Sequence, residues 1–101
     1  MGVSVALSLR LVAKSGKEEE VADFLRNALP AVEAEPATVA WFAVRFDERT
    51  FGIFDAFPDE TGRQAHMTGV VADALRKQWS DLLAEPPQVL KCNILAAKLP
   101  G

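Results

Sequence analysis

Apolar and polar residues alternate along the first part of the chain with the period of a β-strand. Every second residue over Val3–Val12 is apolar, which is the pattern of a strand with one buried face. Ser15 then stands three residues before Glu18, the spacing of a helix capping box. Apolar residues follow at helical intervals: Val21, Phe24, Leu25 and Ala28. We expect a strand and then a helix that Pro30 kinks or ends.

The middle of the chain has the pattern of a β-hairpin. Glu35-Pro36-Ala37 predicts a turn, because the residue before a proline is pushed out of helical geometry. Thr38–Phe46 and Thr50–Phe57 are both rich in β-branched and aromatic residues. Asp47-Glu48-Arg49 separates them and indicates a short loop. We therefore expect two antiparallel strands that lie side by side.

The pattern of the second half of the chain predicts a helical region followed by a strand. Pro58-Asp59-Glu60 places a proline and two acids where the first turn of a helix favours them. Gly69 predicts a break into two helical pieces, and Glu85-Pro86-Pro87 predicts the end of the second. A last strand is expected over Gln88–Lys98. The order β-α-β-β-α-β predicts an α+β, ferredoxin-like fold with an antiparallel sheet and helices on one face.

The second predicted strand is apolar on both faces. One face carries Val39, Trp41 and Ala43, and the other carries Ala40, Phe42 and Val44. Helices can cover only one face of such a sheet, and an apolar area of more than a few hundred Å² is seldom left in water. We therefore expect a homodimer in which two sheets pack against each other.

Length, charge and cysteine content exclude several classes of protein. A chain of 101 residues forms one domain, which we take as 1–101. The net charge is -3 and the basic residues are scattered, so we expect no nucleic-acid partner. No run approaches the roughly 20 apolar residues of a membrane span. The single cysteine, Cys92, cannot form an internal disulfide, which fits a reducing compartment, and we expect a cytoplasmic protein.

The only histidine, His66, is the first candidate for chemistry. Imidazole titrates near neutral pH, so His66 is a candidate base or hydrogen-bond donor, and a structural histidine is the alternative. One histidine without neighbouring ligands cannot hold zinc or iron. The sequence also has no glycine-rich phosphate loop, Walker lysine motif or GxSxG elbow. We expect neither a metal nor a cofactor.

Aromatic residues are the second group of candidates. Trp41 and Trp79 offer flat surfaces for stacking, and Phe42 and Phe54 belong to the predicted hairpin. We take these four residues as candidates for binding a small aromatic or hydrophobic molecule, with plain core packing as the alternative.

Two charges interrupt the predicted hairpin strands. Arg45 and Asp55 must face solvent, pair with a partner or serve a ligand. We expect them to lie near the sheet edge or the dimer interface, where a bridge between guanidinium and carboxylate would satisfy both. A role in binding is the alternative.

Several motifs together resemble those of the antibiotic biosynthesis monooxygenase family, over nearly the whole chain. They are Ala34-Glu35-Pro36 before the strand with Trp41, Phe51–Phe57, Pro58-Asp59-Glu60, Gly62-Arg63, Ala65-His66-Met67-Thr68-Gly69 and Ala96-Ala97-Lys98. The resemblance implies a dimeric α/β barrel in which each ferredoxin-like subunit has its own pocket. It also implies that His66 is the helical histidine of that pocket and Trp41 the aromatic residue of the second strand.

The resemblance further implies an enzyme without a prosthetic group. The expected function is a cofactor-independent monooxygenase that oxidises a small aromatic substrate, such as a quinol or an anthrone, with O₂. His66 would hold or remove a phenolic proton. The chain departs from some relatives in having no tyrosine. The alternatives are a small-ligand-binding or stress-related dimer without catalysis and a small-molecule isomerase of the same fold. Haem degradation is not expected, because Ser8 and Phe57 stand where that branch uses asparagine and tryptophan.

Overall fold

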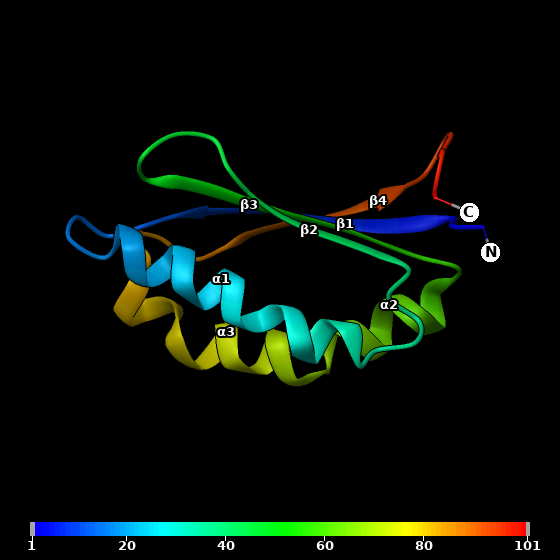
Figure 1. Cartoon of the computed structure of the whole chain (residues 1–101), viewed down its shortest axis with the longest axis horizontal. Coiled ribbons are helices and arrows are strands. Elements are labelled where there is room, and N and C mark those ends of the chain that lie inside the picture. The colour runs from blue at the N-terminus through cyan, green and yellow to red at the C-terminus, as the bar shows by residue number, and fades with distance from the viewer. Residues whose placement is uncertain (1, 101) are drawn as a thin grey trace.

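A four-stranded antiparallel sheet carries helices on one of its faces (Figure 1). The computed structural model describes residues 2–100. Their elements are β1 (Val5–Val12), α1 (Glu18–Glu33), β2 (Ala40–Arg45), β3 (Thr50–Phe57), α2 (Glu60–Met67), α3 (Val70–Leu82) and β4 (Gln88–Asn93). The strand order is β2-β3-β1-β4, and every neighbouring pair is antiparallel. The predicted α+β, ferredoxin-like fold is confirmed, including the break of the second helical region at Gly69.

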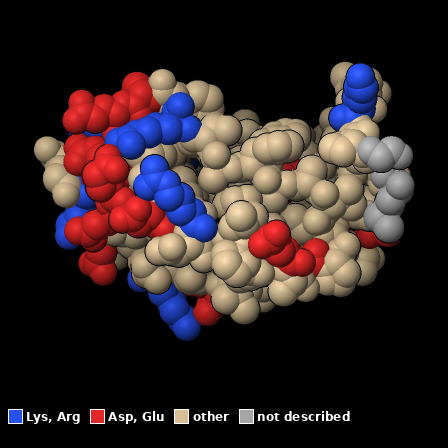
Figure 2. Space-filling view, viewed as in Figure 1, with Lys and Arg blue, Asp and Glu red and all other residues tan. Residues whose placement is uncertain are grey.

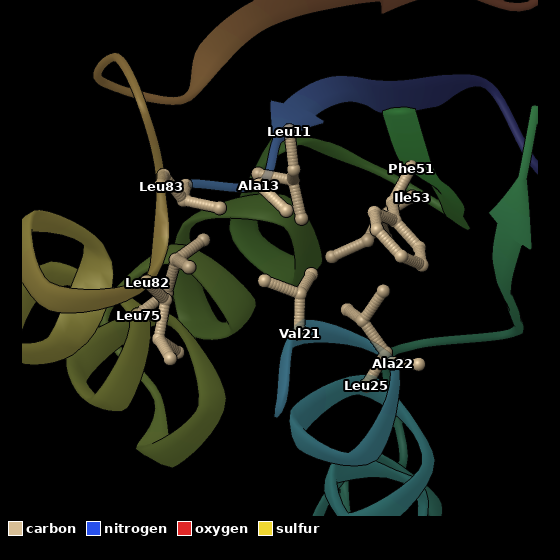
Figure 3. Close-up of a cluster of buried hydrophobic side chains, with 10 residues drawn as sticks. All are labelled: Leu11, Ala13, Val21, Ala22, Leu25, Phe51, Ile53, Leu75, Leu82 and Leu83. Atoms are coloured by element: carbon tan, nitrogen blue, oxygen red, sulfur yellow. The ribbon is translucent and has the colours of Figure 1, made fainter. Parts of the chain in front are cut away.

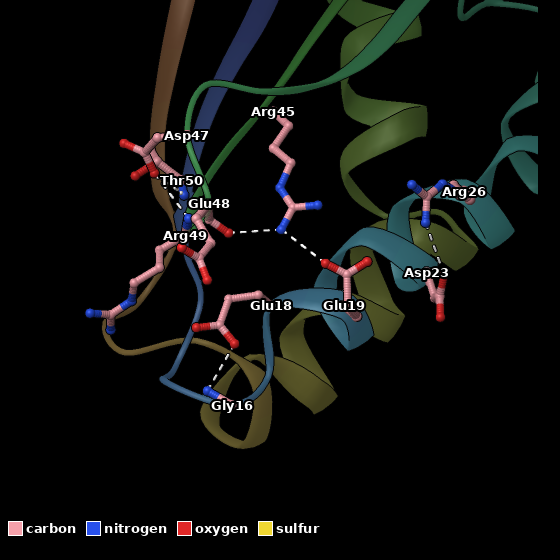
Figure 4. Close-up of polar contacts among 10 residues, drawn as sticks. All are labelled: Gly16, Glu18, Glu19, Asp23, Arg26, Arg45, Asp47, Glu48, Arg49 and Thr50. Atoms are coloured by element: carbon pink, nitrogen blue, oxygen red, sulfur yellow. Dashed lines mark hydrogen bonds and ion pairs between the residues drawn. The ribbon is translucent and has the colours of Figure 1, made fainter.

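The start and the end of α1 both differ from the prediction. Lys17 occupies the N-cap without a side-chain cap, and the Glu18 carboxylate accepts the backbone N–H of Gly16 at 2.8 Å (Figure 4). The expected capping box with Ser15 is therefore wrong. Pro30 lies inside the helix and does not end it. The helix continues to Glu33 because Val32, two residues after Pro30, is buried against the rest of the fold.

The last strand is shorter than expected. β4 ends at Asn93 and not at Lys98, because its partner β1 begins at Val5, directly opposite Asn93. One further backbone bond, from Ile94 N–H to Ser4 O at 2.9 Å, follows, and the chain then leaves the sheet. The described residues after this point include Leu95, whose side chain is almost fully exposed.

The core fills the space between the inner sheet face and helices α1 and α3. Side chains from both layers meet there (Figure 3): Leu11, Ala13, Val21, Ala22, Leu25, Phe51, Ile53, Leu75, Leu82 and Leu83. Burial of this apolar cluster is the main favourable contribution to folding. It also fixes the distance between sheet and helices, and so the space that remains between them further along the sheet.

Charged side chains gather at one end of the molecule. Figure 2 shows them over the β2–β3 hairpin and the start of α1, while most of the remaining visible surface is uncharged. Arg45 lies here, 3.0 Å from the Glu19 carboxylate and 2.9 Å from the Glu48 carbonyl oxygen (Figure 4). Arg45 therefore pairs as expected, but with α1 and not with Asp55. Within residues 2–100, no helix combines the length and apolar character of a membrane span.

Candidate active site

Helix α2 places His66 against the inner face of the sheet. The Asp59 carboxylate caps this helix by accepting the backbone N–H of Gly62 at 2.9 Å. His66 then falls in the last turn, where the helix dipole favours a positive charge. The residue is 7% exposed, and its ring packs against Phe57 with the ring centres 5.4 Å apart. His66 is thus held inside the protein.

Two carboxylates contact the two nitrogens of this imidazole. His66 Nδ1 lies 2.6 Å from Glu35 Oε1, and His66 Nε2 lies 3.0 Å from Asp55 Oδ2. Asp55 belongs to the interior strand β3 and is completely buried, whereas Glu35 follows the end of α1. The ring is held from both sides, so its orientation is fixed by contacts from two other parts of the chain.

These contacts determine the charge of His66. Burial of the ring lowers the pKa of His66, but the bonds and charges of Asp55 and Glu35 outweigh burial and raise this pKa to about 8. His66 is therefore mostly an imidazolium at neutral pH. In that form its single positive charge offsets one of the two neighbouring carboxylates, and the ring has no lone pair with which to accept a proton.

An apolar cavity of about 240 Å³ opens beside this cluster, between the sheet and helices α2 and α3. Trp41 and Trp79 line it together with several aliphatic residues, and its charged side chains are Asp55, His66 and Arg76. A cavity of about 150 Å³ holds benzene, and pockets for drug-sized ligands begin at about 300 Å³. The space therefore fits a molecule of one or two aromatic rings better than one of three.

The cavity wall contains a donor and an acceptor that lack partners. Among the described residues, the buried atoms Trp41 Nε1 and Asp55 Oδ1 have no hydrogen-bond partner. The other oxygen, Asp55 Oδ2, faces His66 Nε2 at 3.0 Å. Trp41 and Asp55 are directly opposite each other in the β2–β3 ladder, so they share one face of the sheet. Buried polar groups are normally paired, and a bound ligand with a hydroxyl group could satisfy both.

The structure brings together three of the five candidate residues. His66, Trp41 and Trp79 all line the same cavity. Phe42 and Phe54 do not: they pair with each other across the hairpin on the outer face, with exposed fractions of 59% and 43%. The reason is the two-residue period of a strand, which turns Phe42 away from the face of Trp41. Their expected place in an aromatic pocket beside His66 is therefore corrected.

From the sequence, a role in binding is only the alternative for Asp55, and Glu35 is not a site candidate. Asp55 was expected near a sheet edge with Arg45, yet β3 lies between β2 and β1, and Asp55 points to the inner face. Its spacing from Ile53 and Phe57 was the available signal, because residues two apart share a face. Glu35 carried no comparable signal, since its contact with His66 spans 31 positions of the chain. Over residues 2–100, no three His, Cys, Asp or Glu side chains are arranged to hold a metal ion.

Comparison with solved structures first defines the class of fold. A candidate antibiotic biosynthesis monooxygenase from Nitrosomonas europaea superposes with a TM-score of 0.82 at 18% identity, over 94% of this chain and 93% of the other. A second candidate, from Caulobacter crescentus, gives a TM-score of 0.80 at 12% identity, over 93% and 92%. The expected resemblance is thus confirmed for the fold: the chain has the fold of the antibiotic biosynthesis monooxygenases.

A relative with much higher sequence identity shows the family to which the chain belongs. The NE2512 protein of Nitrosomonas europaea, described as a protein of unknown function, is 52% identical over 98% of this chain and 96% of its own, with a TM-score of 0.96. The chain belongs to the family of the NE2512 protein. The sequence matches no family model and no curated protein.

Proposed function

We propose that the protein is a cofactor-independent monooxygenase that oxidises a hydroxylated aromatic compound of one or two rings with O₂. The observation that carries this proposal is the buried Asp55 carboxylate, which lines an apolar cavity: its Oδ2 faces the imidazolium of His66, and its Oδ1 has no hydrogen-bond partner. A carboxylate that faces an apolar cavity is placed to take the proton of a bound hydroxyl group. The cavity volume favours a quinol or a naphthol over a three-ring anthrone.

The proposed first step is the transfer of a proton. The substrate hydroxyl donates to Asp55, which takes its proton, and the indole N–H of Trp41 then donates to the phenolate oxygen that remains. His66 stays protonated through this step and stabilises the site by its charge. This assigns the role of proton acceptor to Asp55 and that of electrostatic partner to His66.

The second step uses the electrons of the substrate itself. The phenolate carries electron density to a ring carbon, which forms a C–O bond with O₂ and, with a returned proton, becomes a hydroperoxide. The O–O bond then breaks, and the carbon loses its hydrogen as a carbonyl forms, so that one oxygen atom stays in the quinone and the other leaves as water. Substrate plus O₂ gives quinone plus H₂O, and no other reductant is needed. Trp41 and Trp79 would exclude bulk water from the anion.

Oxygen uptake by the purified, metal-free protein tests this function. Hydroquinones, naphthols and anthrones would be compared, with Asp55→Asn and His66→Ala beside the wild type and Asp81→Asn as a control on the exposed end of α3. We expect uptake with the smaller compounds and a loss of at least about a hundredfold in the two site variants. Uptake no faster than autoxidation, or equal rates in Asp55→Asn and Asp81→Asn, would rule the proposal out.

An isomerase is the second candidate, because the same Asp55 carboxylate, with one oxygen free of protein partners, could move a proton between two carbon atoms of a substrate. Such a reaction needs no oxygen. Conversion of a substrate under nitrogen, at the rate seen in air and dependent on Asp55, would favour the isomerase. A ligand that binds and is never converted would favour the non-catalytic alternative.

We also propose that two copies of the chain pair through their outer sheet faces. No helix among residues 2–100 covers this face, and it carries several exposed apolar side chains: Phe42, Val44, Phe54 and Leu90. Pairing would remove these side chains from water.

A further inference from the structure

The carboxylate of Glu35 joins three separate segments of the chain. Its Oε1 accepts a hydrogen bond from Thr38 Oγ1 at 2.7 Å and lies 2.6 Å from His66 Nδ1. Its Oε2 lies against Gly69 at the junction of α2 and α3, where an added Cβ would be only 2.9 Å away. The Glu35 side chain is 20% exposed. A single carboxylate therefore contacts the turn before β2, the last turn of α2 and the start of α3.

Glu35 is the group that contacts Nδ1 of His66. Asp55, from β3, faces the other ring nitrogen, and Arg76, from α3, lines the same cavity. Arg63, one turn earlier on α2, is paired with Glu60 at 2.6 Å. An N–H on Nδ1 that donates to Glu35 fixes which way the ring faces, and a carboxylate beside it favours the protonated ring.

We propose that Glu35 is a positioning residue of the site, which holds His66 Nδ1 so that Nε2 faces Asp55 and which keeps the ring in its imidazolium form. Its effect on turnover rests on the proposed function, whereas its effect on His66 does not. The competing explanation is purely structural. Glu35 would only stabilise the turn before β2 through its hydrogen bond with Thr38, and the charge of His66 would not depend on Glu35.

Titration of His66 by nuclear magnetic resonance separates these two explanations. The chain has one histidine, so its imidazole signals need no further assignment. We expect a midpoint near 8 in the wild type and a midpoint lower by about one pH unit in Glu35→Gln, because a neighbouring charge is lost. Glu33→Gln removes the same charge from an exposed position two residues earlier and should leave the midpoint unchanged.

Two further variants make the test specific. Thr38→Val removes the hydroxyl bonded to Glu35 but keeps the carboxylate, so the midpoint should stay near that of the wild type. Glu35→Asp keeps the charge at a greater distance, and we expect a midpoint between those of Glu35→Gln and the wild type. An equal midpoint in wild type, Glu35→Gln and Glu35→Asp would overturn the proposal, as would a fall in Thr38→Val as large as that in Glu35→Gln.

Oxygen uptake then tests whether Glu35 affects turnover, separately from its effect on the titration of His66. If the midpoint falls and Glu35→Gln also loses uptake while Glu33→Gln keeps it, Glu35 acts on turnover through His66. If the midpoint falls but neither the wild type nor any variant consumes oxygen with the panel, the positioning role stands and the monooxygenase function fails. A wild-type rate of uptake in Glu35→Gln despite a lowered midpoint would overturn the role in turnover.

Discussion

His66 and Asp55 bury opposite charges that depend on each other. Asp55 is completely buried in an interior strand, and a buried carboxylate without a cationic partner is costly. His66 supplies that partner, and Glu35 is a second carboxylate on the opposite side of the ring. Removal of His66 leaves both carboxylates without a cation, so His66 is expected to affect stability as well as chemistry.

The stability of the fold should depend on pH through His66. The pKa of His66 is about 8 in the folded protein, against the ordinary value of 6.5 expected in the unfolded chain, so the folded state binds the proton more tightly. This contribution is fully present below pH 6.5 and is lost as the pH rises through 8, and it amounts to about 2 kcal/mol. Urea unfolding at several pH values measures it. The free energy of unfolding should decrease between pH 6.5 and pH 8 in the wild type but not in His66→Gln. An equal decrease in both proteins would contradict the assignment of this pH dependence to His66.

Trp41 should recognise a hydroxyl group through its indole N–H. Trp41→Phe keeps an aromatic ring but removes the unpartnered donor. We expect about tenfold weaker binding of a naphthol, which corresponds to the loss of one good hydrogen bond, and little change in the binding of naphthalene. Calorimetric titration with the two compounds provides the comparison. Equal losses for both compounds would mean that Trp41 contributes only its flat surface.

The sequence predicted part of this site and missed the rest for a physical reason. His66 and Trp41 could be found because each stands out locally, as the only histidine and as an aromatic residue in a clear strand. Asp55 was placed at an edge because the order of strands in a sheet is a property of tertiary structure. Glu35 was missed because its partner lies in another element. The charge of His66 depends on its contacts with Asp55 and Glu35, so it could not be predicted either.

At the scale of elements, α2 is a short helix that carries His66 and therefore depends on its cap. Asp59→Ala removes the acceptor of the Gly62 N–H and should lower the free energy of unfolding by about 1 kcal/mol. Chemical denaturation measures this, with Asp81→Ala as a control at an exposed position that should change stability by less than about 0.5 kcal/mol. Equal stabilities for the two variants would show that the cap is not needed.

The strand over Thr50–Phe57 has the bounds that its β-branched and aromatic residues predict. It is an interior strand and pairs with β1 along its whole length. The predicted ends are wrong where contacts with other elements determine the end of a helix or strand. Helix α1 continues past Pro30 because Val32 is still buried, and β4 ends where β1 no longer provides a partner. Local sequence determines the type of an element more reliably than its ends.

At the scale of the whole molecule, the uncovered outer sheet face predicts a dimer. Phe54→Asp places a charge in the centre of this face and should convert the dimer to a monomer at micromolar concentration. Val70→Asp makes the same kind of change at an exposed position on α3 and should leave the dimer intact. Light scattering measures the mass of each. A wild-type protein that is monomeric at micromolar concentration would contradict the predicted assembly.

The most direct test of the site is the ionisation of a bound naphthol, followed by its absorption spectrum. If Asp55 accepts the hydroxyl proton inside the cavity, the wild type should bind the ligand as its anion at a pH where the free ligand is neutral. Asp55→Asn should bind it in the neutral form, while Asp81→Asn should behave like the wild type. A ligand that binds in the cavity and remains neutral in the wild type, or ionises equally in Asp55→Asn, would contradict the role of Asp55 as the base.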